Sequence, residues 1–265
     1  IPKDITKAIY YFTLSARQGN IISCKYLGII YINDIDIPAN PKFALYYLNK
    51  AAKKSNTDAL FILSALYYQS DLILRDIDKS IFYLKEGSSF NDPKAKNNLA
   101  LLYKNGDGVP KNINMAIEYL NEAIKNNNDE YAMYNLARIY YFGIGVNKNS
   151  QISIDLLTRK KKKDFVFFQI FLSGINIDHN NDIFNIIDRN RNINITISPY
   201  DVESKQKLLE FIKNYDLFYT IKNDENAFFE SLYSHFNLFY KKDEKSCCIN
   251  NLRDINEDFY EGFYH

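Results

Sequence analysis

The chain has 265 residues, of which 46% are hydrophobic and 25% are charged, a composition typical of a folded protein with a buried core. Lys and Arg number 33 against 32 Asp and Glu, so the formal net charge of +1 argues against nucleic acid or an anionic membrane as the partner. The three cysteines form neither a disulfide framework nor a zinc-binding pattern, and no stretch reaches the ~20 apolar residues of a membrane span. We therefore expect an intracellular, cytoplasmic protein with no metal, no other cofactor and no membrane partner.

A short phrase recurs along the first half of the chain at a nearly constant interval. It begins at Ile1, Ile37, Ile73, Val109 and Val146, which gives intervals of 36, 36, 36 and 37 residues. A period in this range is the signature of stacked helical hairpins, none of which can bury its apolar face alone. Because the phrase at Ile1 aligns with a connecting loop, we expect the chain to be a segment of a longer polypeptide.

The first helix of each predicted unit is amphipathic. Its apolar face combines small and large residues at i, i+3, i+4 and i+7 spacing, and the small ones let a neighbouring helix approach closely. The corresponding sets are Ala8, Phe12 and Ala16; Ala44, Leu48 and Ala52; Ser80, Leu84 and Ser88; and Ala116, Leu120 and Ile124, with a shortened copy at Ser153, Ile154 and Leu157.

A polar turn then leads into a second helix, which carries a Leu, a small residue directly after it and a Tyr one helical turn on. These triplets are Leu27, Gly28 and Tyr31; Leu63, Ser64 and Tyr67; Leu99, Ala100 and Tyr103; and Leu136, Ala137 and Tyr140. The exit loops that follow carry glycines at positions 106, 108, 143 and 145, where we expect positive φ. Leu72 takes such a place in the second exit loop and predicts a different path there, since Leu avoids positive φ.

Taken together, these features resemble the Sel1-like repeat, a relative of the tetratricopeptide repeat. The resemblance rests on the Leu-small-x-x-Tyr helix, the Gly-x-Gly-Val loop and the Val-Pro-Lys-Asn lead-in, and it covers residues 1 to about 160. It implies an all-α fold: a right-handed α-solenoid of about four and a half stacked hairpins over residues 1–163. Residues 164–265 are predicted to form a helical C-terminal cap, because a solenoid end must be covered.

The cap itself has weaker patterns. Residues 182–189 suggest a short helix, and residues 190–197 alternate polar residues with Ile, which suggests a strand or extended loop. Ser198 and Pro199 predict the start of a helix that runs to about Ile221, and a further helix begins near Asp224. The acidic, aromatic tail at 258–264 is interpreted as a packed or frayed end, with a linear peptide for another protein as the alternative.

No catalytic, cofactor-binding or metal-binding constellation is evident. None of the three histidines at positions 179, 235 and 265 lies in a catalytic pattern, and the Gly106-Asp107-Gly108 loop lacks the residues of a phosphate-binding loop. The basic run at 159–163 is interpreted as a helix end, with an anchor for acidic protein, phosphate or RNA as the alternative.

The candidate binding surface lies opposite the apolar face of the first helices. In related solenoids the first helices line a concave groove, so the resemblance implies that these positions face a protein or peptide partner. Exposed aromatic residues flanked by Arg and Lys are typical of interface hot spots. The candidates are Tyr10, Arg17, Tyr46, Asn49, Lys53, Phe82, Lys85, Glu118, Asn121 and Lys125.

The sequence therefore predicts a protein-binding scaffold or adaptor that is not an enzyme. The first alternative is an accessory region of a larger enzyme, such as a protein kinase, with its catalytic domain upstream of residue 1. The second is nucleic-acid binding through the run at 159–163, which would make affinity depend steeply on salt.

Overall fold

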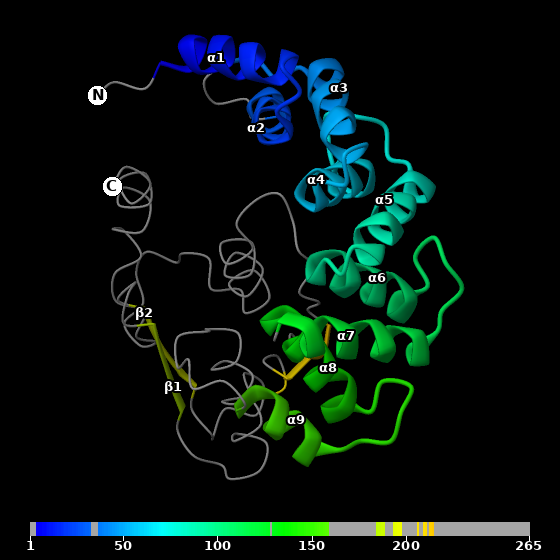
Figure 1. Cartoon of the computed structure of the whole chain (residues 1–265). Coiled ribbons are helices and arrows are strands. Elements are labelled where there is room, and N and C mark those ends of the chain that lie inside the picture. The colour runs from blue at the N-terminus through cyan, green and yellow to red at the C-terminus, as the bar shows by residue number, and fades with distance from the viewer. Residues whose placement is uncertain are drawn as a thin grey trace. The chain divides into compact units, whose positions relative to one another are not determined.

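The computed structural model of the chain describes residues 4–32, 37–127, 129–158, 184–188, 193–197, 206, 209–210 and 212–214. Its elements are helices and one pair of strands (Figure 1): α1 (Ile5–Arg17), α2 (Ile21–Ile32), α3 (Pro41–Ala52), α4 (Thr57–Tyr68), α5 (Ile77–Ser89), α6 (Pro93–Asn105), α7 (Ile113–Asn127), α8 (Glu130–Phe142), α9 (Ser150–Thr158), β1 (Phe184–Asp188) and β2 (Ile193–Ile197). The chain divides into two compact units. Unit 1 contains α1 to α7 and the start of α8, and unit 2 contains α8 from Tyr134 onward, α9 and the strands.

Every one of the nine helices α1 to α9 begins after an Asn or Asp whose side-chain oxygen accepts a backbone N–H of the first turn. Such a cap satisfies one of the unpaired donors at a helix start and contributes about 1 kcal/mol. Because an Asn or Asp recurs at this position in every repeat, the sequence itself defines where each helix begins. The caps are Asp4, Asn20, Asn40, Asn56, Asp76, Asp92, Asn112, Asp129 and Asn149.

The turns and loops between helices confirm the predicted backbone conformations. Gly19, Ser55 and Asn91 close the polar turns with φ of 90°, 58° and 61°. The four exit-loop glycines also have positive φ, between 66° and 79°. Leu72 does not, so the second exit loop follows a different path, as predicted. The first exit loop lies outside the described residues.

The more extensive helix pairing runs across the exit loops, which corrects the predicted phase of the repeat. The sequence pattern paired α1 with α2 and α3 with α4, but α2 contacts α3, α4 contacts α5 and α6 contacts α7 more extensively. Within each of these hairpins two tyrosine rings stack, and their centroids are 6.1, 6.0 and 5.8 Å apart. These ring pairs are Tyr31 with Tyr47, Tyr67 with Tyr83 and Tyr103 with Tyr119.

The core of unit 1 runs along the array. At its N-terminal end α1 and α3 lie on the outer side of the bend, and α2 and α4 lie on the inner side (Figure 1). We call α1, α3, α5 and α7, which hold the same place in successive repeats, the outer helices, and α2, α4 and α6 the inner helices. Most of the predicted small residues are buried, and Ala8, Ala52 and Ser88 are half-buried. At Gly28 the helices meet closely, since a Cβ added there would lie 2.5 Å from Cγ of Leu48. Fully buried residues of this cluster include Leu27, Leu48, Ala51, Ala59 and Leu63.

Unit 2 differs in part from the predicted helical cap. The short helix predicted at 182–189 is wrong, because Phe184–Asp188 is a strand that pairs antiparallel with Ile193–Ile197. The second strand confirms the extended structure predicted at 190–197. The described residues between 206 and 214 are helical, in agreement with the predicted helix, and Nε of Arg138 on α8 donates to the carbonyl oxygen of Ile212 at 2.5 Å.

Several predictions fall outside the described residues. The boundary predicted between residues 163 and 164, the helix predicted near Asp224, the basic run at 159–163 and the tail at 258–264 all lie there. Within the described part of the chain, no helix combines the length and the apolar character needed to cross a bilayer.

Candidate protein-binding face

Aromatic side chains stand out into solvent at the same position of three consecutive outer helices. Tyr10 on α1, Tyr46 on α3 and Phe82 on α5 are 59%, 59% and 56% exposed, although large apolar groups are normally buried. Each ring packs edge-on against the Tyr that follows it, with centroids 5.3, 5.0 and 5.3 Å apart. These contacts fix the orientation of each ring while leaving one side of it open.

Polar and basic residues share these faces. Positions i, i+4, i+7 and i+11 lie on one side of a helix, which places Arg17 in line with Tyr10, and Lys42 and Lys53 in line with Tyr46. The side chains of Arg17, Lys42, Lys53 and Lys85 are exposed, and within the described part of the chain they have no ion-pair or hydrogen-bond partner. The predicted candidates on α7 (Glu118, Asn121 and Lys125) are exposed as well, but no aromatic residue accompanies them on that face.

Asn49 differs from the other candidates because its side chain is occupied. Its Nδ2 donates to the carbonyl oxygen of Leu45 at 2.8 Å, and its Oδ1 accepts the hydroxyl of Tyr83 at 2.7 Å. The second bond joins α3 to α5. Asn49 therefore links neighbouring repeats and is only half-exposed.

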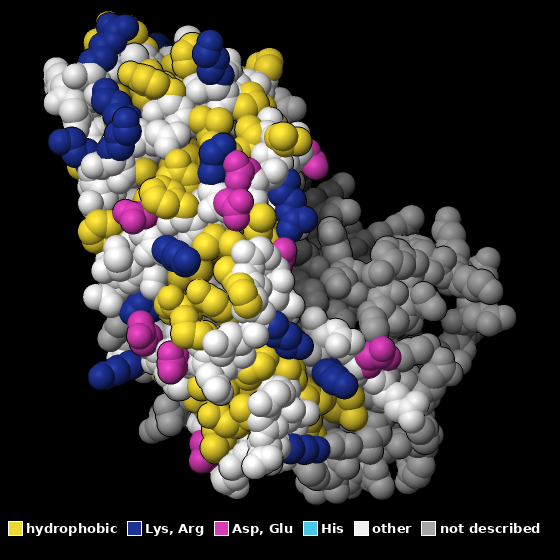
Figure 2. All heavy atoms as spheres, turned by 90° about the vertical axis from the view of Figure 1, so that its right-hand side faces the viewer, with side chains coloured by type: hydrophobic (Ala, Val, Ile, Leu, Met, Phe, Trp, Pro, Cys, Tyr) yellow, Lys and Arg dark blue, Asp and Glu magenta, His cyan; other side chains and the backbone are white. Residues whose placement is uncertain are grey.

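The aromatic row lies on the outer side of the array and not in a concave groove. Its first two members belong to α1 and α3, whereas α2 and α4 line the inner side of the bend (Figure 1). Figure 2 views this outer side and shows hydrophobic side chains exposed along it, with Lys and Arg gathered towards the N-terminal end. The prediction that these residues line a concave groove is wrong. The pattern of one helix defines its exposed face but not the side towards which the array bends.

Sequence reasoning missed two members of this face. Lys42 precedes Tyr46 by one helical turn, and Phe43 is 49% exposed with its ring centroid 5.3 Å from that of Tyr31. The i, i+4 spacing could have identified Lys42. Phe43 had no comparable signal, because an aromatic residue in the first turn of an amphipathic helix is usually buried.

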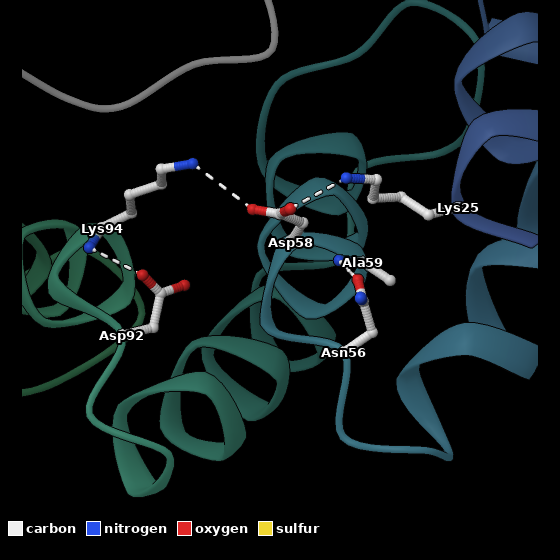
Figure 3. Close-up of polar contacts among 6 residues, drawn as sticks. All are labelled: Lys25, Asn56, Asp58, Ala59, Asp92 and Lys94. Carbon is white, nitrogen blue, oxygen red and sulfur yellow. Dashed lines mark hydrogen bonds and ion pairs between the residues drawn. The ribbon is translucent and has the colours of Figure 1, made fainter. Parts of the chain in front are cut away.

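A separate charged network links the starts of the inner helices. Nζ of Lys25 on α2 lies 3.0 Å from Oδ2 of Asp58 on α4, and Nζ of Lys94 on α6 lies 3.4 Å from Oδ1 of the same carboxylate (Figure 3). Burial of Asp58 would raise its pKa, but the hydrogen bonds and charges of Lys25 and Lys94 outweigh burial and lower it. Each of these charges has its partner, so the network joins three repeats and offers no vacant site.

The comparisons with known proteins agree with this architecture. The family model described as Sel1 repeat matches residues 1–20, 21–56, 57–89, 93–128 and 130–159. The chain belongs to the Sel1 repeat family. The matched segments 21–56, 57–89 and 93–128 contain the helix pairs α2 and α3, α4 and α5, and α6 and α7, which supports the corrected phase. The resemblance seen in the sequence is thereby confirmed for the repeats.

One solved structure shows the same fold for this Sel1 repeat protein. A Sel1 repeat protein from Oxalobacter formigenes is 26% identical with a TM-score of 0.54, and the match covers 60% of this chain and 64% of the other. A protective antigen of uropathogenic Escherichia coli strains, with an SLR fold, is 23% identical with a TM-score of 0.46 over 66% of this chain and 45% of the other. The chain thus spans less than two thirds of either protein. No curated protein matches it.

The comparisons identify Sel1 repeats and no catalytic domain. Among the described residues there is no group of three or more His, Cys, Asp or Glu side chains arranged to hold a metal ion. Cys24 is buried, and burial raises the pKa of its thiol. The three histidines and the other two cysteines lie outside the described residues.

Proposed function

We propose that this Sel1 repeat protein is a non-catalytic scaffold that binds another protein through the exposed faces of its outer helices. The supporting observation is the row formed by Tyr10, Tyr46 and Phe82, which are more than half exposed at matching positions of consecutive repeats. Rigidly held aromatic residues beside cations are typical of interface hot spots, because they cover a large area at little cost in conformational entropy.

The repeat architecture suits this role. A solenoid presents the same face of successive helices side by side, so a partner can contact several repeats at once. Bonds between repeats hold those faces in register: Nζ of Lys50 on α3 donates to the carbonyl oxygen of Ala16 on α1 at 2.9 Å, and Tyr83 donates to Asn49. The aromatic row is therefore largely organised before a partner arrives, which lowers the entropic cost of association.

Affinity capture from lysate of the native cells tests the proposal. The bait carrying Tyr46→Ala and Lys53→Ala is compared with the unchanged protein and with a control bait. The control carries Leu74→Ala and Lys111→Ala, at two exposed residues away from the row. We expect a partner retained by the unchanged bait and by the control but lost by the first variant. A partner retained equally by all three baits, or no partner at all, would contradict the proposed face.

A further inference from the structure

The charges on the outer helices are distributed unevenly. From the start of α1 to its end, and from the start of α3 to residue 54, the chain carries Lys7, Arg17, Lys42, Lys50, Lys53 and Lys54 and no acidic residue. Outer helices α5 and α7 instead mix both signs, with Asp78, Lys79, Lys85 and Glu86 on α5 and Glu118, Glu122 and Lys125 on α7. A chain of net charge +1 thus concentrates positive charge at one end of its outer side.

Two of these six cations already have partners. Lys7 lies 3.2 Å from Asp4, and Lys50 donates to Ala16. Arg17, Lys42, Lys53 and Lys54 are exposed, and in the described part of the chain none has an ion-pair or hydrogen-bond partner. Exposed cations on one side of the molecule without a counter-charge attract anionic groups.

The same surface is apolar between the cations. Tyr10, Phe43 and Tyr46 are each about half exposed or more, and we call these three together with Arg17, Lys42 and Lys53 the basic aromatic face. The bond from Lys50 to Ala16 joins its two helices. A ligand that neutralises the cations and also covers the aromatic rings needs carboxylates together with apolar side chains. Phosphate groups alone would leave the rings in water.

The spacing along α3 sets the geometry of that ligand. Lys42 and Lys53 are eleven positions apart on one stripe, and at 1.5 Å per residue this is about 16 Å, with Tyr46 between them. An extended peptide advances about 3.3 Å per residue, so about five residues span the same length.

We propose that the basic aromatic face binds an acidic segment of a partner protein, in which two carboxylates about five residues apart flank an aromatic or large apolar side chain. The segment lies extended along α3. Its carboxylates meet Lys42 and Lys53, and its apolar side chain packs against Tyr46. This inference rests on the proposed scaffold function and adds the chemistry of the partner.

An array of labelled synthetic peptides tests this chemistry with the full chain. Each peptide holds a Phe between two Glu residues, the spacing between the Glu residues increases stepwise along the series, and a parallel series replaces Glu by Gln. We expect fluorescence polarisation to show the tightest binding at a spacing of about five residues. The Gln series should bind at least about tenfold more weakly, and added salt should weaken the Glu series by screening.

Variants locate the binding. Combined Lys42→Glu and Lys53→Glu should weaken the best peptide by about tenfold or more, whereas Lys111→Glu, an identical charge change in the exposed loop before α7 and away from the row, should change affinity less than about twofold. Circular dichroism and Tm should stay unchanged, because these side chains are exposed and unpaired. Affinity that is independent of spacing or of Lys42 and Lys53 would overturn the proposal. So would tighter, variant-sensitive binding to single-stranded RNA or to phosphatidylserine vesicles.

The two levels of the proposal can fail separately. If cellular capture depends on Tyr46 and Lys53 but no acidic peptide binds, the scaffold function stands and the acidic partner is rejected. If capture and peptide binding both fail, the scaffold function on this face is rejected.

Discussion

Two aspartates near the starts of inner helices have opposite electrostatic environments. Asp58 lies between Lys25 and Lys94, which together outweigh its burial and lower its pKa. Asp92 caps α6 and is 8% exposed, and burial raises its pKa despite the hydrogen bond from the backbone N–H of Lys94. A lowered pKa stabilises the fold above the unfolded-state pKa, and this is lost as pH falls through the folded-state value. A raised pKa contributes stability at low pH that is lost as pH rises through the folded-state value.

The Asn variants of these two residues should therefore behave differently. Asp58→Asn should lower stability at neutral pH by at most about 1 kcal/mol, since the carboxylate is half exposed, and should reduce the loss of Tm on acidification. Asp92→Asn keeps a good N-cap without a buried charge, so stability at neutral pH should hold or rise. Thermal unfolding of both variants across the acidic range checks this, and equal effects of the two substitutions would contradict it.

Lys96 on α6 is a cation with only 3% of its surface exposed. Its Nζ lies 2.8 Å from Oε2 of Glu122 on α7 and donates to Oδ1 of Asn91 at 2.9 Å. Glu122 is 56% exposed, so leaving one charge without its partner costs a different free energy for each of the two residues. A carboxylate left alone would be solvated by water, whereas the ammonium would stay buried without its counter-charge.

We expect the substitution of the exposed partner to cost more than that of the buried one. Glu122→Ala should destabilise by about 1–3 kcal/mol, because it leaves the Lys96 charge buried with only the neutral side chain of Asn91 as a partner among the described residues. Lys96→Met preserves the volume and should cost less than about 1 kcal/mol, since replacing a buried charge by an apolar group is often nearly neutral. Urea unfolding at neutral pH measures both, and the reverse order would contradict this reasoning.

At the scale of elements, the contact of α2 with α3 depends on a missing side chain. Gly28 faces Leu48, which is fully buried, and a Cβ on Gly28 would lie 2.5 Å from Cγ and 2.7 Å from Cδ2 of that residue. The helices are therefore closer there than any larger residue allows. The equivalent positions on the next two inner helices hold larger residues, Ser64 on α4 and Ala100 on α6, and both are buried.

Gly28→Ala should destabilise the protein although Ala favours helix by about 1 kcal/mol over Gly. The overlap with Leu48 typically costs about 1–3 kcal/mol in a packed core. In a Leu48→Ala background the overlap is absent, so the same substitution should become neutral or stabilising. Denaturant unfolding of the four proteins of this double-mutant cycle gives the coupling, and additive effects would show that the two side chains do not compete for space.

At the scale of the molecule, burial within unit 1 is uneven along the array. Only Ala16 of α1 is buried, whereas Ala59, Leu60, Phe61, Ile62, Leu63, Ser64 and Leu66 of α4 all are. Because each repeat of a solenoid is stabilised mainly by its neighbours, helices with few buried contacts open locally at low free energy.

Native-state hydrogen exchange should resolve this difference. Amides of α1 should exchange through local opening with weak dependence on denaturant, and those of α4 should approach the free energy of global unfolding. Lys50→Met should further reduce protection of the last turn of α1, because it removes the hydrogen bond to Ala16, while α4 should be unaffected. Equal protection of α1 and α4 would contradict a graded array.

The repeat, the helical class and the positive-φ turns could all be predicted from the sequence, because each depends on neighbouring residues. A period of 36 and residue-specific backbone preferences are sufficient to predict these features. The recurring Asn and Asp caps also indicate where the helices start, although the sequence analysis did not use them. The exposed positions of Tyr10, Tyr46 and Phe82 were predictable for the same reason, since helical spacing separates one face from the other.

Three features required the folded structure: which helices pair most closely, towards which side the array bends, and which polar groups are already hydrogen-bonded or ion-paired. Asn49 and Lys53 look alike in the sequence as candidates, yet Asn49 is bonded to Tyr83 from the next repeat and Lys53 remains unpaired within the described residues. The strand at 184–188 was also missed, because the pattern of one segment does not show the strand with which it pairs, here the neighbouring Ile193–Ile197. The bond that engages Asn49 comes from a residue 34 positions away, and a local pattern carries no information about which distant group will fill such a place.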